Sequence, residues 1–150
     1  MTIPEFNIWL KKNTERIPEE VVFPTANQLI EQISSRVVDT GRSSNRNLFS
    51  YYSAPYLKKK KKRIPGASFK NFYFFGDMWK SFGIKDREDT PGKTVIICRM
   101  DNDSRGKVTN QGLLEIHSDH ENKELIAPND QEIELARKYF NEKLQELYVS

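Results

Sequence analysis

The residues that most resemble a metal site lie close together near the end of the sequence. His117, Asp119, His120 and Glu121 all carry side chains that bind zinc in proteins. The two histidines are three residues apart, however, whereas helical zinc proteases place theirs four apart on one helix face, and no further ligand is evident. We therefore interpret these residues as a polar surface turn and expect no metal ion.

Cys98 is the only cysteine among the 150 residues and the only thiol nucleophile available. It lies in the apolar run KTVIICRM, where a buried and unreactive thiol is the usual state. No base or orienting group is organised around it, and the sequence has no GxGxxG or Walker-type glycine loop for a nucleotide. We expect neither catalysis nor a cofactor. A lone cysteine also excludes an intramolecular disulfide and points to a reducing compartment.

Positive charge is concentrated in residues 42–63, which contain eight basic residues and no acid. The eight are Arg42, Arg46, Lys58, Lys59, Lys60, Lys61, Lys62 and Arg63. Such residues bind phosphates by displacing counterions, and Tyr51, Tyr52 and Tyr56 can stack on bases. A solvated loop, or an arm that binds an acidic neighbouring protein, is the alternative that we favour. The net charge of +3 is too small to indicate a nucleic-acid-binding protein by itself.

Hydrophobic spacing predicts two helices in the first part of the chain. An apolar stripe indicates a short helix over residues 4–14, and Pro18 interrupts it. Thr25, followed three residues later by a glutamine, has the pattern of a capping box and begins an amphipathic helix over residues 25–39. Gly41 ends this helix, because glycine readily adopts the left-handed conformation that often follows one.

The rest of the chain is predicted as an arm, a sheet and a final helix. Residues 42–68 have no sustained period and predict a long extended basic arm or loop. Residues 69–127 hold an aromatic block, interpreted as core, and a β-meander whose clearest strand is residues 93–100. Residues 124–127 are a further strand candidate. A second capping pattern begins the C-terminal helix over residues 129–147.

These elements predict an α+β fold in a single domain, residues 1–150. A small antiparallel β-sheet packs against the amphipathic helix, 25–41 with its cap, and against the C-terminal helix, and the basic arm extends from this body. The sequence has no run of about 18 apolar residues and no apolar stretch typical of a secretion signal at its start. We therefore expect a protein that neither spans a membrane nor is secreted.

Several landmarks follow one another along the chain in a distinctive order. They are the early amphipathic helix, YYSAPYLKKK, FYFFGDMWKS, KTVIICRM and, before the last helix, LIAPN. This order resembles the neck and tail-completion proteins of tailed phages, including the virion morphogenesis proteins of Mu-like phages. In that family a YS…Y…K stretch precedes a box of the form L-x-x-T-G-x-L/M-x-x-S. Phe75 stands here where the box usually has threonine.

The other residues of this box have a clear physical sense. Gly76 permits a tight chain reversal and Asp77 can cap the turn that follows. The remaining positions, which we expect to bury and complete the box, are Met78, Trp79, Ser81 and Phe82. The resemblance implies a structural virion protein without catalysis. Such a protein forms a closed ring in the head-tail connector or upper tail, beside portal, connector or tail proteins, after synthesis in the cytoplasm of the bacterial host.

Two hypotheses follow for the basic segment. In the first, residues 42–63 leave their own domain and lie on the next subunit, against residues 115–146, which hold nine acids and four basic residues. Some of the lysines would then also make weak contacts with packaged DNA in the channel. In the alternative, the chain is a small basic nucleic-acid-binding protein that acts through the run from Lys58 to Arg63.

Overall fold

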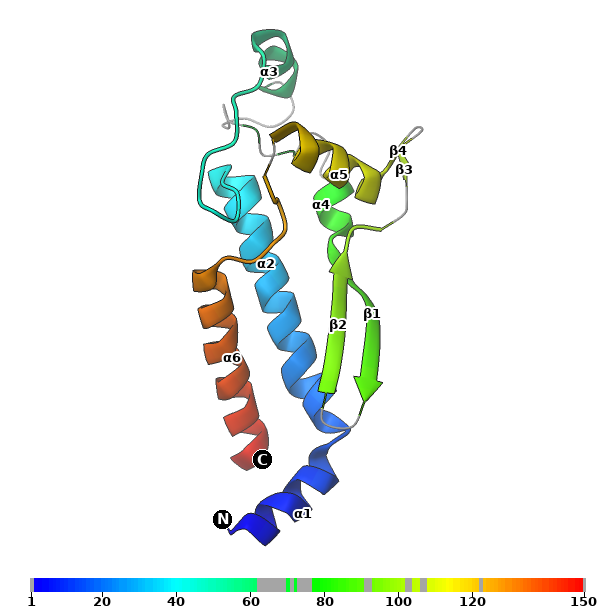
Figure 1. Ribbon diagram of the computed structural model, residues 1–150, viewed down its shortest axis with the longest axis vertical. Helices are drawn as coiled ribbons and strands as arrows, with labels where there is room; N and C mark the ends of the chain where they lie inside the picture. Colours follow the sequence, from blue (N-terminus) through cyan, green and yellow to red (C-terminus); the bar gives the residue numbers. More distant parts are fainter. Residues whose placement is uncertain are drawn as a thin grey trace.

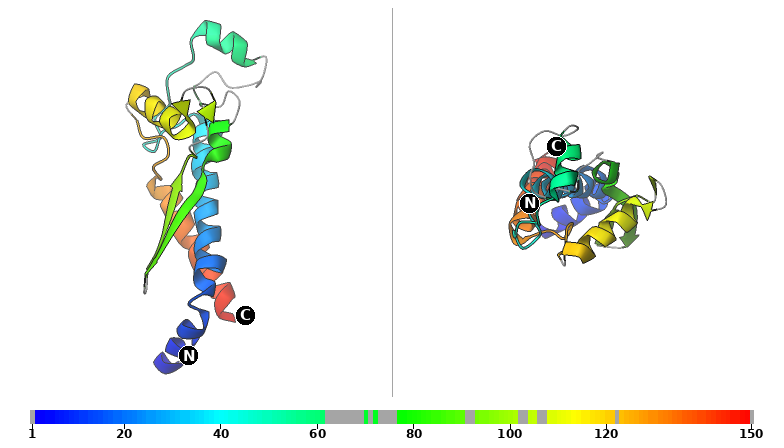
Figure 2. Two further views of the ribbon diagram at one scale, coloured as in Figure 1. Left: turned by 90° about the vertical axis from the view of Figure 1, so that its right-hand side faces the viewer. Right: turned by 90° about the horizontal axis from the view of Figure 1, so that it is seen from above.

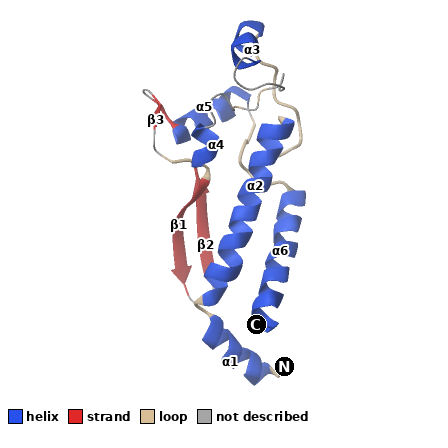
Figure 3. Ribbon diagram, turned by 180° about the vertical axis from the view of Figure 1, so that it is seen from behind, coloured by secondary structure: helices blue, strands red, loops and turns tan. Residues whose placement is uncertain are grey.

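The computed structural model describes residues 2–61, 70, 72, 77–90, 93–101, 104–105, 108–121 and 123–149. A long helix, α2 (Phe23–Thr40), lies between the C-terminal helix α6 (Asp130–Val149) and a hairpin of two strands, as Figure 1 and Figure 3 show. The strands are β1 (Gly83–Thr90) and β2 (Lys93–Arg99). The fold is therefore α+β, and the hairpin packs against α2 as predicted. The C-terminal helix α6 packs mainly on α2 and not, as predicted, on the sheet.

The remaining elements lie towards the two ends of this body. Helix α1 (Ile3–Asn13) and the π-helical turn η1 (Pro18–Val22) precede α2 at one end. The other end carries α3 (Ala54–Lys61), α4 (Asp77–Ser81), α5 (Asn110–Glu121) and the short strands β3 (Ser104–Arg105) and β4 (Val108–Thr109). None of the helices in the described ranges is long and apolar enough to cross a membrane.

The first helix forms nearly where its apolar stripe predicts it. Its start is fixed by a capping box that the sequence analysis did not identify. The backbone N–H of Thr2 donates to the Glu5 carboxylate at 2.6 Å, and the N–H of Glu5 donates back to the Thr2 hydroxyl at 3.4 Å. Two of the unpaired donors at the helix start are satisfied in this way.

The predicted start of the second helix at Thr25 is wrong. The Thr25 hydroxyl donates to the Val21 carbonyl at 2.7 Å, one helical turn earlier, so it is not a cap. The chain is already helical from Pro18, and the Phe23 N–H bonds to the Pro18 carbonyl in a wide π turn. Pro24 follows in the next position and has no N–H to donate to the preceding turn. The helix therefore continues past this proline through the irregular turn instead of breaking there.

The two helix ends predicted from local chemistry are confirmed. Gly41 has a φ of 62° and its N–H bonds back to the carbonyls of Arg36 and Val37, so it ends α2 in the left-handed conformation. At the start of α6, the Asn129 side chain accepts from the Glu132 N–H and the Glu132 carboxylate accepts from the Asn129 N–H, both at 2.9 Å. This is a reciprocal capping box.

The sheet is smaller than the predicted meander. Strands β1 and β2 pair antiparallel, with Gly83 opposite Arg99 and Thr90 opposite Lys93, and among the described strands β3 pairs only with β4. Strand β2 confirms the strand expected at residues 93–100. The strand candidate at residues 124–127 is wrong. This segment is a loop whose carbonyl groups bind a side chain of α2 instead of a neighbouring strand.

That side chain belongs to Arg36, which is buried where α2 faces the start of α6. Its Nε donates to the buried Glu132 carboxylate at 2.8 Å. The other guanidinium nitrogens donate to the carbonyls of Arg42, Leu125 and Ala127 at 3.0, 3.3 and 2.9 Å. One arginine therefore joins α2 to α6 and to two loops through four partner residues.

The apolar core extends from α2 to the end that carries α4 and α5. Met78, Trp79 and Phe82 are buried, as expected for the box. Ser81 is also buried, and its hydroxyl donates to the Met78 carbonyl at 2.8 Å. Gly76 lies outside the described residues, as do most members of the aromatic block. Within the part described, the interpretation of this block as core is correct.

The prediction of a long extended arm over residues 42–68 is wrong for the described part of that segment. Residues 42–50 fold back on their own chain, with a bridge between Arg42 and Leu48 and with Ser43 and Phe49 buried. Residues 54–61 form α3, because Pro55 suits a first helical turn and leucine and lysine are good helix formers. Residues 62–68 lie outside the described residues.

Candidate functional site

The lysine run is carried on a segment that stands apart from the body, and we call residues 51–61 the basic projection. Helix α3 lies beyond α5 at one end of the molecule in the views of Figure 1 and Figure 2. Lys58 and Lys59 are exposed on it. Lys60 and Lys61 complete the helix, whereas Lys62 and Arg63 lie outside the described residues. The basic projection therefore presents at least two lysine side chains to the surroundings.

The three predicted tyrosines have different environments. The rings of Tyr52 and Tyr56 lie 4.6 Å apart, and the Tyr52 hydroxyl accepts from the Phe72 N–H at 3.0 Å. Desolvation raises the pKa of Tyr56 above its usual value. Tyr51, by contrast, is 71% exposed. Two of the tyrosines therefore brace the base of α3, and Tyr51 is the one available for a contact with another molecule.

The basic projection begins at a closed neck, which we define as Ser50, Lys70 and Glu121. The Lys70 N–H donates to the Ser50 carbonyl at 3.1 Å, so the chain leaves the body and returns to it at the same point. The Glu121 carboxylate, whose side chain is 5% exposed, accepts from the Ser50 N–H at 3.1 Å, from its hydroxyl at 2.6 Å and from the Lys70 ammonium at 2.8 Å. One buried carboxylate thus holds both sides of the neck.

The electrostatics of Glu121 follow from these partners. Burial alone would raise the pKa of this carboxyl group. The hydrogen bond and charge of Lys70, together with two hydrogen bonds from Ser50, outweigh the burial and lower the pKa from 4.5 to about 2. Glu121 is therefore ionised throughout the physiological range, and the neck has its full strength there.

Arg42 and Arg46 do not join the lysine run. The Arg42 guanidinium donates to the Arg46 carbonyl at 2.7 Å, and the Arg46 guanidinium bonds to the side chain of Gln131 on α6. Arg46 also has a positive φ of 62° in the tight turn at residues 43–47. Both arginines hold this turn against the body. The structure therefore separates them from the candidate site that the sequence analysis assigned to them.

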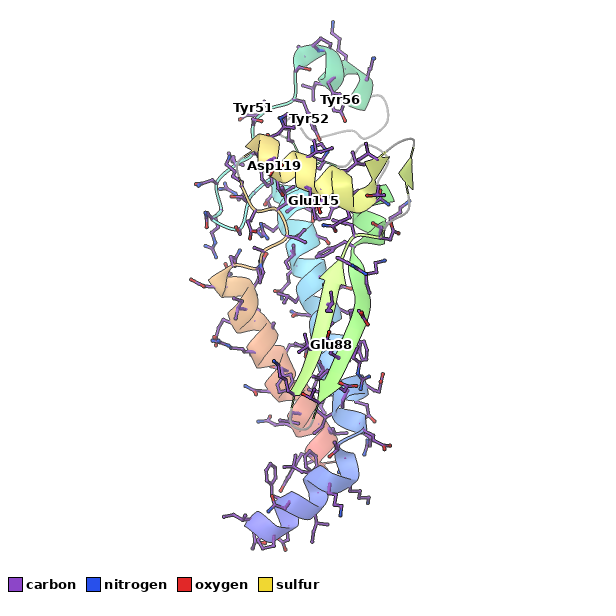
Figure 4. The ribbon with its side chains drawn as sticks, turned by 45° about the vertical axis from the view of Figure 1, so that its right-hand side comes forward. Tyr51, Tyr52, Tyr56, Glu88, Glu115 and Asp119 are labelled. Atoms are coloured by element: carbon purple, nitrogen blue, oxygen red, sulfur yellow. The ribbon has the colours of Figure 1, made fainter. Side chains whose placement is uncertain are left out.

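The predicted acidic surface divides into two parts. On α6, the exposed carboxylates of Glu134 and Glu146 lie within 3.6 and 2.6 Å of Arg137 and Lys143, so the helix neutralises part of its own charge. On α5, Glu115 and Asp119 are exposed, and neither has an ion-pair partner among the described residues. Figure 4 shows both on the end of the molecule that carries the tyrosines.

The groups that resembled a metal or catalytic site are not arranged as one. Within the described ranges, no three histidine, cysteine, aspartate or glutamate side chains come together as metal ligands. His117 packs its ring 4.7 Å from that of Phe72, and burial, followed by the charge of Lys70, lowers its pKa. Cys98 is half-buried, and burial raises the pKa of its thiol, which makes the reactive thiolate scarcer.

Glu121 is the residue of the neck that the sequence does not indicate. The sequence predicts a polar surface turn there, whereas Glu121 ends α5 and its side chain is buried. Its partners Ser50 and Lys70 are 71 and 51 residues away, so no local pattern could have identified the contact. Comparison with known proteins adds no relative, because no family, no curated protein and no solved structure matches the chain.

Proposed function

We propose that this chain is a non-catalytic structural subunit of a tailed phage, which assembles into a ring at the head-tail junction or in the upper tail. The observation that carries this proposal is the basic projection, held beyond the body by a neck whose Glu121 carboxylate is buried. Lys58 and Lys59 are exposed and have no ion-pair partner among the described residues, so they are available to an acidic partner. The order of the sequence landmarks supports the phage setting.

The partners in this proposal are further copies of the chain and the portal, connector or tail proteins above and below the ring. A ring whose axis follows the long axis of the subunit keeps each element at the same height in every copy. The end that carries α3 then lies level with α5 of the neighbouring copy. We therefore propose Glu115 and Asp119 as the acidic groups that receive the lysines, because the acids of α6 are partly neutralised and lie lower.

The test replaces the lysine run with serine, a change in five side chains that leaves the neck intact. The replaced residues are Lys58, Lys59, Lys60, Lys61 and Lys62. We expect light scattering to show loss of the ring, while circular dichroism and thermal unfolding show a folded monomer. A matched control removes five exposed positive charges from other elements. These are Lys11, Lys12, Lys80, Arg137 and Lys138. Intact rings from the first variant would exclude the proposed contact.

The second candidate is a small nucleic-acid-binding protein. The exposed ring of Tyr51 on the same projection as Lys58 and Lys59 favours it, because stacking and phosphate contacts together bind single strands. This function predicts submicromolar binding by the monomer, with a steep decrease in affinity as salt rises. Size-exclusion chromatography with light scattering, with and without DNA, separates the two. If the ring also lines a DNA channel, its binding will be weak and independent of sequence.

A further inference from the structure

The hairpin of β1 and β2 has one face on the body and one face turned away from it. On the inner face, Ile84 and Cys98 pack against the core, and the Arg87 guanidinium lies 5.3 Å from the centre of the Phe23 ring at the start of α2. Side chains alternate along a strand, so the next positions lie on the outer face. These positions are Asp86, Glu88, Lys93, Val95, Ile97 and Arg99.

Both strands of this hairpin are edge strands. Among the described residues, the backbone of β2 has no hydrogen bond to any element except β1, so one side of β2 has free N–H and C=O groups. Such edges can pair with a further strand. On β1 the bulge between Ile84 and Asp86 interrupts the edge, which is regular from Asp86 to Thr90. Strand β2 has only apolar residues and threonine between Lys93 and Arg99.

The charges on the outer face differ in sign between the two strands. Strand β1 presents the carboxylates of Asp86 and Glu88, both exposed, and Figure 4 labels Glu88 on the hairpin. Strand β2 presents the exposed side chains of Lys93 and Arg99 and no acid. None of these four groups has an ion-pair partner in the part of the chain that the structure describes. The two edges are therefore complementary to each other.

We propose that the free edge of β2 in one copy pairs antiparallel with the free edge of β1 in the next copy. This inference rests on the proposed ring, for which it names the contact between neighbouring subunits. Pairing β2 with a second β2 would place two basic strands side by side, and pairing β1 with β1 would bring the carboxylates together. Only the β1–β2 contact brings opposite charges together. Because this contact joins two different edges, it repeats from copy to copy and closes when the rotation allows.

The contact also supplies what an isolated hairpin lacks. Two strands alone are marginally stable, and three or more with an apolar face are needed for a robust sheet. In the ring, every β1 and β2 would have a strand on both sides, and strand direction would alternate throughout. Val95 and Ile97, which are half-buried in one subunit, would then gain a neighbouring strand on their open side. The ring would contain one continuous sheet in place of separate hairpins.

Charge reversal tests this contact and offers a rescue. Lys93→Glu with Arg99→Glu should raise the concentration needed for half-assembly by about tenfold or more, since like charges then meet across the edge. Asp86→Lys with Glu88→Lys should do the same. With all four substitutions in one chain, the concentration needed for half-assembly should return to within about threefold of the wild-type value, because complementarity is restored with the opposite sign.

The matched control reverses two exposed charges away from the hairpin, with Lys11→Glu and Lys12→Glu on α1. Circular dichroism checks that each variant folds. If the quadruple variant folds but does not assemble, the inference is overturned. An effect of the α1 control as large as that of the hairpin variants also overturns it, because the loss would then reflect net charge alone.

A disulfide test locates the contact independently. In a Cys98→Ala background, one chain carries Glu88→Cys and a second chain carries Val95→Cys, so neither can close a bond within itself. In a ring that keeps each element at the same height, Glu88 of one copy lies level with Val95 of the next, because these residues are paired in the hairpin. Oxidation of a mixed assembly should therefore give covalent dimers on a non-reducing gel. Glu134→Cys on α6 mixed with Val95→Cys is the control and should give no such dimers.

The outcomes separate this inference from the proposed function. Rings seen by electron microscopy, with no disulfide-linked dimer and no effect of charge reversal, overturn the edge contact and leave the ring standing. A wild-type chain that stays monomeric at every soluble concentration overturns both. Disulfide-linked dimers together with rescue by the quadruple charge reversal support the contact.

Discussion

Replacement of Glu121 by glutamine should weaken the neck that holds the basic projection. Glutamine keeps the size of the side chain but removes the negative charge that Lys70 and Ser50 stabilise. The carboxyl pKa falls from 4.5 to about 2 in the folded chain. At about 1.4 kcal/mol per pKa unit, the charged form contributes about 3 kcal/mol to the free energy of unfolding at pH 7. We expect Glu121→Gln to lose most of this amount.

The same contribution sets the expected dependence on pH. A carboxyl group with a lowered pKa stabilises the fold above its unfolded pKa and loses that effect as the pH falls through the folded pKa. The difference in stability between wild type and Glu121→Gln should therefore be complete above about pH 5. It should shrink to less than half at pH 3 and disappear below pH 2.

Urea denaturation at pH 7 and pH 3 measures both effects. Glu115→Gln, an exposed change on the same helix, is the control and should alter stability by no more than about 0.5 kcal/mol. If the neck opens without global unfolding, the amides of Ser50 and Lys70 should instead exchange on the order of a hundredfold faster. If Glu121→Gln is as stable as Glu115→Gln and its Ser50 and Lys70 amides exchange at the wild-type rate, the reasoning is refuted.

Three further changes test the body. Arg36→Met should lower the free energy of unfolding by about 3–5 kcal/mol, because it leaves Glu132 buried without its charge partner, and adding Glu132→Met should recover much of the loss in the same urea titration. Gly41→Ala should cost about 1–2 kcal/mol in thermal unfolding, since a φ of 62° strains any residue with a Cβ; an unchanged melting temperature would count against this conformation. Asn129→Ala should cost about 1 kcal/mol by removing the cap of α6, whereas Asn129→Ser should keep most of it, as urea denaturation would show.

The parts of the fold that were predictable have causes within a few residues. Gly41 and the Asn129 capping box fix the limits of helices through their own hydrogen bonds, and both were found where the sequence predicted them. Strand β2 was found as well, because its residues are apolar and β-branched. The same local cue misled at Thr25, whose hydroxyl has a choice between capping a helix and bonding one turn back inside it.

The parts that were not predictable depend on residues far apart in the chain. Residues 124–127 look like a strand, but their carbonyl groups bind Arg36 from α2, 89 and 91 residues away. Residues 42–50 look like an arm because their own sequence does not show that Phe49 enters the core. The basic projection was predicted as a candidate site, whereas Glu121 in its neck was not, because its partners come from two other segments.

The closed neck makes the body tolerant of change at one position. The backbones of Ser50 and Lys70 already touch, so the length of peptide between them adds only a closure entropy that grows slowly with length. Peptides of different length or sequence can therefore be inserted there without moving α2, α6 or the hairpin. This position is a natural insertion point, where an epitope tag or a foreign binding loop should leave the scaffold folded.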